Sequence, residues 1–229
     1  MLEEFSAVAV DDYELKPDFN VAPSKKVYAV LQRDERQLRT VKWGLIPSWA
    51  KDPKIGNRLN NARLETAAEK PSFRSAYKKR RCLIPADGYY EWYTLEADKR
   101  ADGRKAKPKK QPYYIHPRDG AEMAMAGLYE IWRNKEIDDD DAAGAFVWTC
   151  TILTTSATDD VGRIHDRMPL LVSPDHWTDW LDPALETPDP SALTPAAPGL
   201  LEAYPVSTDV NVVRNNDPSL IKPIPLSTQ

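Results

Sequence analysis

R-C-L-I-P-A-D-G-Y-Y-E-W, residues 81–92, is the stretch around which the rest of the chain is arranged. Residues 82–84 are apolar and predict a short buried strand, and residues 85–88 carry the proline, aspartate and glycine typical of a turn. The large aromatic side chains of residues 89–92 predict a second strand. One carboxylate, Glu91, lies inside that second strand.

The aromatic neighbours of Glu91 suggest an acid–base role. Apolar neighbours exclude water from a carboxylate and raise its pKa, as a general acid near neutral pH requires. The same residue on the polar side of an alternating strand would face solvent and take part in no chemistry. Glu130, in the similar stretch G-L-Y-E, could equally be the buried carboxylate, and the residues alone do not decide between the two.

Composition sets the broad class of the protein. The chain has 229 residues, of which 41% are hydrophobic and 29% charged, and these values are ordinary for a soluble globular protein. It contains no run of eighteen apolar residues and no hydrophobic signal segment, so we expect a cytoplasmic protein without a membrane span. Cys82 and Cys150 lie in strand-like runs and are expected to be reduced core residues. Because neither these cysteines nor the three histidines have metal-ligand spacing, we expect no metal site and no cofactor.

Charge is distributed unevenly along the chain, although the net charge is only −4. Residues 70–81 contain basic but no acidic side chains, and residues 99–110 form a second basic stretch. Residues 168–213 contain acidic side chains and neither lysine nor arginine. One face could therefore bind phosphates while another is acidic, or both stretches could be ordinary solvated surface.

Short strands dominate the pattern, which predicts one α+β domain over residues 1–229, with a curled, mostly antiparallel sheet and peripheral helices. Strands are expected at residues 26–31, 38–43, 112–116, 123–132 and 146–155, with a last edge strand within 210–224. Helical structure is expected in residues 1–16, 67–69 and 156–164, and after the N-cap Ser173. Residues 99–111 are expected to form a long surface hairpin tip.

A loop with two tryptophans, W-G-L-I-P-S-W-A, occupies residues 43–50. Exposed on a loop, such rings are stacking platforms for unpaired bases, and buried they are only core.

Four separated pieces, N-A-R-L-E-T (61–66), G-Y-Y-E-W (88–92), G-L-Y-E (127–130) and I-H-D-R-M-P (164–169), need a common explanation. Together with F-N-V-A-P (19–23), Y-P-V-S (204–207) and N-V-V-R (211–214), they resemble the SRAP (SOS response-associated peptidase) family, whose members are abasic site processing proteins. The pieces cover nearly the whole chain in the family's order. The resemblance implies a β-rich fold with a concave basic surface for single-stranded DNA.

The resemblance also implies a covalent mechanism. Family members recognise the open-chain aldehyde left by a lost base and crosslink to it through a cysteine directly after the initiator methionine. The α-amine forms an imine and the thiol closes a thiazolidine ring, which shields the lesion. Autoproteolytic removal of the methionine explains the peptidase name, and lyase-like activity accompanies the crosslinking.

Site residues are implied by matching motifs. Asn61 matches the asparagine that hydrogen-bonds the sugar remnant, Glu91 the acid that shuttles protons, and His165 the histidine that assists sugar ring opening and crosslink reversal. On residue type alone, Asn61 could be a turn residue and His165 a loop histidine. The expected DNA-contacting residues are Arg63, through a bidentate phosphate contact, the wedge or stacking residues Pro23, Trp49 and Phe73, and the basic Arg74 and Arg81. We expect Asn61, Glu91 and His165 to converge on one concave pocket.

The amino terminus departs from the family pattern, because M-L-E-E-F stands where the family has Met-Cys-Gly-Arg. We expect that the catalytic first strand is missing and that the chain as written binds single-stranded DNA without forming the thiazolidine. The leading hypothesis is an abasic-site processing protein of the cytoplasm and nucleoid, acting as a monomer on single-stranded DNA. The alternative is a DNA-binding module that lacks a nucleophile. A hydrolase acting on other proteins is disfavoured, because no residue present is a credible nucleophile.

Overall fold

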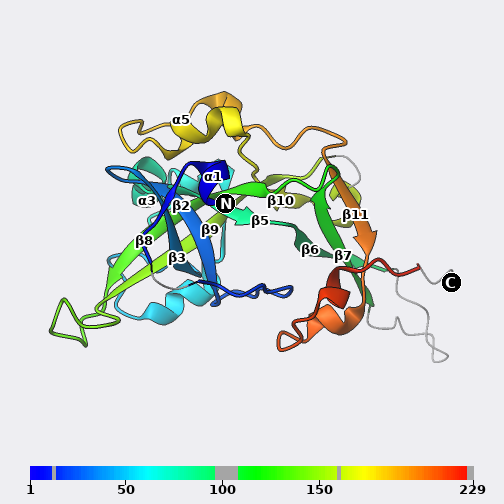
Figure 1. Cartoon of the computed structure of the whole chain (residues 1–229), viewed down its shortest axis with the longest axis horizontal. Coiled ribbons are helices and arrows are strands. Elements are labelled where there is room, and N and C mark those ends of the chain that lie inside the picture. The colour runs from blue at the N-terminus through cyan, green and yellow to red at the C-terminus, as the bar shows by residue number, and fades with distance from the viewer. Residues whose placement is uncertain (12–13, 96–107, 159–160, 226–229) are drawn as a thin grey trace.

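The computed structural model describes residues 1–11, 14–95, 108–158 and 161–225, and its framework consists of two β-sheets (Figure 1). The strands of the large sheet are β1 (Val8–Ala9), β2 (Lys26–Gln32), β3 (Arg36–Trp43), β4 (Asn61–Arg63), β5 (Arg81–Ala86), β8 (Met123–Arg133), β9 (Phe146–Ser156) and β10 (Arg167–Pro169). Their order is β1-β3-β2-β5-β8-β9-β10, and β4 pairs with β9.

The large sheet curls until its two ends meet. The pairs β2–β3, β2–β5, β5–β8 and β8–β9 are antiparallel, whereas β3 joins β9 in parallel through the pairs Lys42↔Thr149 and Trp43↔Cys150. This last contact gives a closed, barrel-like sheet. The prediction of an α+β fold with a curled, mostly antiparallel sheet is confirmed.

The second sheet is small and antiparallel. It consists of β6 (Tyr89–Thr94), β7 (Lys110–Pro117) and β11 (Leu201–Pro205), with β7 in the middle. The turn residue Gly88 links it to β5, and a Cβ at this position would collide with the ring of Tyr114. Glycine is therefore required there, and the stretch 81–92 passes from the large sheet to the small one (Figure 1).

Alternation along the strands divides the core into two layers. On β2, Ala29 and Leu31 belong to one apolar cluster and Val30 to another, because successive side chains point to opposite faces. The cluster of Ala29 and Leu31 includes Cys82 and Cys150 of neighbouring strands. The cluster of Val30 is covered by α3 (Arg74–Lys79) and α5 (Trp177–Leu181), and α5 lies across the top of the molecule in Figure 1.

The remaining elements are short. They are the helices α1 (Leu2–Phe5), α2 (Leu64–Ala67) and α4 (Val161–Ile164), and the 3₁₀ helices η1 (Pro53–Arg58), η2 (Pro174–His176), η3 (Pro190–Leu193), η4 (Thr208–Asn211) and η5 (Pro218–Ile221). The expected strands at 26–31, 38–43, 112–116, 123–132 and 146–155 are confirmed within one to two residues. Ser173 is the N-cap residue of η2, which leads into α5, as expected.

Two expected elements are wrong. The helix expected over residues 1–16 is limited to Leu2–Phe5, because Val8 and Ala9 pair with β3 as a strand. The last edge strand expected within 210–224 is replaced by η4 and η5, and the last strand of the described residues is β11. The hairpin tip expected at 99–111 lies mostly outside the described residues.

Candidate active site

A pocket of about 390 Å³ lies where the small sheet meets α4 and η4. It is lined by Glu91, Trp92, Lys110, His165 and Asn211. These side chains come from β6, from the first residue of β7, from the turn after α4 and from the end of η4. The pocket therefore combines residues from four elements of the chain, and it includes two of the three expected catalytic residues.

Glu91 has the environment of a general acid. Its carboxyl group is partly buried, and this burial raises its pKa. Electrostatic interactions with His165 and Lys110 and a backbone hydrogen bond from Trp92 lower the pKa of Glu91, and the charge of Asp166 adds to the rise. Because the raised direction prevails, part of the Glu91 population keeps its proton closer to neutral pH than an exposed glutamate does.

His165 has a defined ring orientation. The backbone N–H of Arg167 donates to its Nδ1 over 3.0 Å. The same Nδ1 lies 3.3 Å from the Arg167 carbonyl oxygen and 3.3 Å from Asp166 Oδ1, so the 165–167 turn holds the ring from this side. The ring is partly exposed, with 43% of the side chain accessible, so its other edge, with Nε2, can reach a bound molecule.

One wall of the pocket is held by a chain of hydrogen bonds. Trp92 Nε1 donates to Asn211 Oδ1 over 2.7 Å, which fixes the plane of the indole. The turn that carries Asn211 is stabilised by the buried Asn20. The Nδ2 of Asn20 donates to the carbonyl oxygens of Val210, Val212 and Asn215. The amino-terminal stretch 19–23 and the carboxy-terminal stretch 210–215 therefore build this wall together. We gave Asn211 and Lys110 no role from the sequence, although N-V-V-R was among the family-like pieces.

A bidentate ion pair connects the His165 turn with α2. Arg167 Nη1 and Nη2 donate to Glu65 Oε1 and Oε2 over 2.6 and 2.9 Å, and Nη2 also donates to the Thr154 carbonyl. Hydrogen bonding from Arg167 lowers the pKa of Glu65. Because Arg167 is two residues after His165, this pair fixes the backbone whose N–H orients the histidine ring.

Asn61 and Arg63 lie on β4, which pairs with the carboxy-terminal part of β9, where β10 also pairs. Strand β4 pairs with β9 through Asn61↔Ile152 and Arg63↔Thr154, while β10 reaches Thr154 through Pro169. Both side chains are exposed and the intervening Ala62 is buried, so they share one outer face. Asn61 is not among the residues that line the pocket, and its convergence with Glu91 and His165 stays a prediction.

Besides Arg63, three of the expected DNA-contacting residues are accessible. Pro23 and Arg74 are exposed, and Trp49 is 58% exposed on its loop. The Trp49 Nε1 donates weakly to the Pro71 carbonyl over 3.5 Å, which puts the indole beside the beginning of the basic stretch 70–81. Of the two alternatives for the tryptophan loop, exposure on the surface applies to Trp49. Trp43 is half-buried, and its Nε1 donates to the Asn60 carbonyl.

Phe73 and Arg81 do not fit the expected role. Phe73 is 5% exposed and packs in the core cluster beneath α3, so it cannot insert between bases. Arg81 is 3% exposed, and its guanidinium donates to backbone carbonyl oxygens of residues 77–78 and 180–185. The assignment of these two side chains as DNA contacts is therefore wrong, because both are buried.

The basic stretch 70–81 is also less available than the sequence suggested. Lys78 forms an ion pair with Glu186 of the acidic segment at 3.0 Å, and Arg80 pairs with Glu130 at 2.9 Å. The basic and acidic segments are thus packed beside each other here and do not form two separate faces. Glu130 is 6% exposed, does not line the pocket and already has Arg80 as its partner, which leaves Glu91 as the acid of the pocket.

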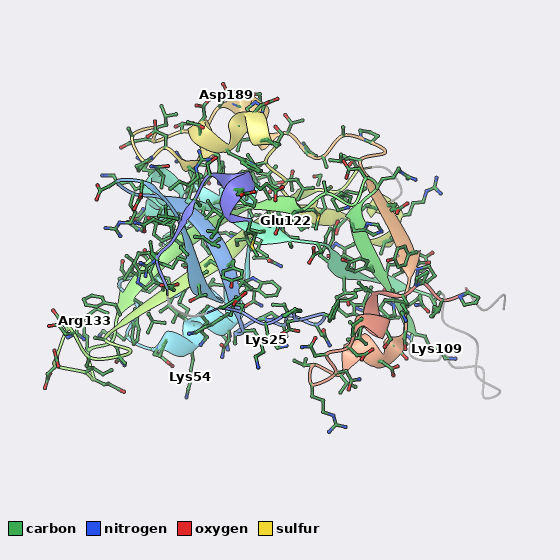
Figure 2. All side chains as sticks on the ribbon, in the orientation of Figure 1. Lys25, Lys54, Lys109, Glu122, Arg133 and Asp189 are labelled. Atoms are coloured by element: carbon green, nitrogen blue, oxygen red, sulfur yellow. The ribbon has the colours of Figure 1, made fainter. Side chains whose placement is uncertain are left out.

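Within the described ranges, no group of three or more His, Cys, Asp or Glu side chains could hold a metal ion. No described helix is both long and apolar enough to cross a bilayer. Figure 2 labels Lys109, which lies at the end of the small sheet and directly precedes the pocket residue Lys110 in the sequence.

Comparison with known proteins gives one consistent result. The family model described as SOS response associated peptidase (SRAP) matches residues 1–213. The abasic site processing proteins YoaM and YoqW of Bacillus subtilis are each 41% identical to this chain, over 91% of it and 86% and 87% of their own lengths. A crystal structure of a Bacteroides thetaiotaomicron protein matches with a TM-score of 0.72 and 29% identity, covering 88% of this chain and 82% of that one. The chain belongs to the SRAP family.

Proposed function

We propose that this protein processes abasic sites in single-stranded DNA. The observation that carries the proposal is the pocket in which the partly buried Glu91, with its raised pKa, faces His165. Relatives that are 41% identical are named abasic site processing proteins, which supports the same class of substrate. An open-chain abasic site presents an aldehyde, and aldehyde chemistry needs proton transfer of the kind that such a pair provides.

Glu91 is the proton donor and acceptor of this chemistry. Addition of an amine to an aldehyde gives a carbinolamine, which must lose its hydroxyl as water, and a neighbouring acid accelerates that step. His165 presents the exposed edge of its ring to the sugar and assists opening of the sugar ring to the aldehyde. The Glu65–Arg167 pair keeps the histidine in this orientation.

The DNA strand follows the face that carries Asn61 and Arg63. Arg63 pairs with a phosphate through its planar guanidinium, and Asn61 hydrogen-bonds the sugar that has lost its base. Trp49 stacks on an unpaired base, an interaction worth about 1–3 kcal/mol. Pro23 and Arg74 border the same path.

Covalent shielding requires an additional group. A thiazolidine forms only when an amine and a thiol lie on adjacent carbons, as they do in an amino-terminal cysteine. Cys82 and Cys150 are fully buried, and burial raises the pKa of both thiols, so neither can replace it. We propose that the 229-residue polypeptide binds abasic DNA without a permanent bond. The same polypeptide preceded by Met-Cys-Gly-Arg forms the crosslink after autoproteolytic loss of the methionine.

A single-stranded DNA-binding module without covalent chemistry is the second candidate. The inaccessible thiols of Cys82 and Cys150 favour it for the 229-residue polypeptide. In either case we propose that the protein acts as a monomer on DNA of the nucleoid.

The test is a binding and crosslinking experiment with three oligonucleotides: an intact single strand, a single strand with one abasic site, and an abasic duplex. Fluorescence anisotropy is expected to give the tightest binding to the abasic single strand. Denaturing electrophoresis is expected to show a crosslink only for the Met-Cys-Gly-Arg form. Equal affinity for all three oligonucleotides would exclude abasic-site processing, and absence of a crosslink from the extended form would favour the binding module.

A further inference from the structure

Lys110 is a pocket residue with no role in the function proposed above. It is the first residue of β7 and pairs with Thr94 of β6, so it lies beside the strand that carries Glu91. It lines the same pocket as Glu91 and His165. Its positive charge acts on Glu91 and lowers the pKa of that carboxyl, opposing the effect of burial.

The amine of Lys110 is not engaged in an ion pair with any residue that the structure describes. Other lysines differ in this respect: Lys25 is paired with Asp18 at 2.6 Å and Lys78 with Glu186 at 3.0 Å. Among the described residues, Lys110 is also the one lysine that lines the pocket. A primary amine next to a general acid is the arrangement that imine formation needs.

We propose that Lys110 captures the open-chain aldehyde of the abasic site as a reversible imine. The inference rests on the proposed function, because the pocket must first receive an abasic sugar. The bond can form without an amino-terminal cysteine, so it gives the 229-residue polypeptide a transient covalent tether.

The step balances without any further reactant. The ammonium of Lys110 first gives a proton to the Glu91 carboxylate. The freed Nζ then adds to the aldehyde carbon, and one of its protons passes to the aldehyde oxygen to give a carbinolamine. Glu91 donates a proton to the carbinolamine hydroxyl, which leaves as water, while Nζ and the carbon form a double bond. The proton lost by the nitrogen returns to Glu91, and addition of water reverses the sequence.

A phosphate contact is the competing role for a lysine at this position, and arginine separates the two. Lys110→Arg keeps the positive charge and forms no stable imine under these conditions, whereas Lys110→Ala removes both functions. Lys109 offers a matched control, because it is exposed, adjacent in sequence and not among the pocket residues (Figure 2).

The experiment is reductive trapping of the 229-residue protein with sodium cyanoborohydride on a single strand that contains one abasic site. Trapped protein is quantified by denaturing electrophoresis, and the modified residue is identified by peptide mass spectrometry. We expect the adduct on Lys110, a fall of at least about tenfold in Lys110→Arg, and no change in Lys109→Arg. Glu91→Gln is expected to slow trapping in the same assay.

Binding of the same oligonucleotide is measured in parallel by anisotropy. The protein could bind the abasic strand selectively and yet give no adduct, or give an adduct on another lysine or on the amino terminus. Either result overturns the role of Lys110 and leaves the proposed function standing. Undiminished trapping in Lys110→Arg also overturns it. Failure to prefer the abasic strand at all refutes the proposed function, and the imine proposal with it.

Discussion

Replacing Arg81 with methionine separates a structural arginine from a DNA-binding one. The basic stretch 70–81 made Arg81 an expected DNA contact, but its guanidinium is buried between α3 and the end of α5 with the segment that follows it. It donates to carbonyl oxygens in residues 77–78 and 180–185. Four of the five donor–acceptor distances are 2.6–2.8 Å, and the fifth is 3.3 Å. Methionine keeps much of the aliphatic volume and removes every one of these donors.

The size of the effect follows from these bonds. A hydrogen bond from a charged donor contributes about 1.5–3 kcal/mol, but removing the cation also removes its own desolvation cost, and carbonyls near the surface can bind water instead. We therefore expect Arg81→Met to lower the free energy of unfolding by about 3–5 kcal/mol, as when a buried charged partner is removed. For a chain of this length that corresponds to a fall of about 6–20 °C in Tm.

The assay combines urea and thermal unfolding, followed by circular dichroism, with anisotropy of labelled single-stranded DNA at a temperature where the variant is folded. Arg74→Met is the matched control, because Arg74 is exposed at the first position of α3. Arg81→Met should lose stability and retain DNA affinity. Arg74→Met should retain stability and lose DNA affinity. An Arg81→Met protein of unchanged stability but weakened DNA binding would refute the structural role of this arginine.

Three further substitutions test the site and its surroundings. In the Met-Cys-Gly-Arg form, Glu91→Gln should slow crosslinking by about 10²–10⁴-fold. Because burial raises the pKa of Glu91, the acid-dependent rate of the parent should fall as pH rises through that pKa. A gel time course from pH 5 to 9 should show no such fall in the variant. Arg63→Ala should reduce the slope of log K against log salt by about 0.7, measured by anisotropy, and an unchanged slope would exclude a phosphate contact. Burial and the neighbouring Glu4 raise the pKa of Glu122 from 4.5 to about 7, so the folded chain holds a proton that the unfolded chain releases, and stability should fall as pH rises between these values. Glu122→Gln should remove that fall in a Tm series, and a parallel decline in both proteins would assign it to other groups.

The strands that were predicted correctly are those specified by local pattern. Residues 146–155 are rich in β-branched and aromatic side chains, and the hairpin between 26 and 43 has a polar turn flanked by apolar alternation. Closure of the sheet could not be predicted, because it depends on the parallel pairing of β3 with β9, which involves residues more than 100 positions apart. Short-range periodicity carries no information about such a contact.

Two of the errors have a common physical origin in long-range hydrogen bonds. Residues 210–215 have strand-like valines, yet they form a turn whose carbonyl oxygens are bound by the side chain of Asn20, about 190 residues earlier. Arg81 resembles its basic neighbours in the sequence and differs from them only in what is packed around it. In both cases a polar side chain satisfies a buried backbone, and its partners lie in a distant part of the chain.

The choice between Glu91 and Glu130 shows the same limit at the level of the site. Both follow aromatic residues in a strand, so desolvation is expected for either. Only the fold shows that Glu130 is neutralised by Arg80, whereas Glu91 faces an open pocket beside His165 and Lys110. The carboxylate of Glu130 is occupied by its arginine partner and does not line the pocket, whereas Glu91 is desolvated in the pocket, which favours its protonated form. The partner of each carboxylate, and not its local sequence, therefore determines which of the two can do acid–base chemistry.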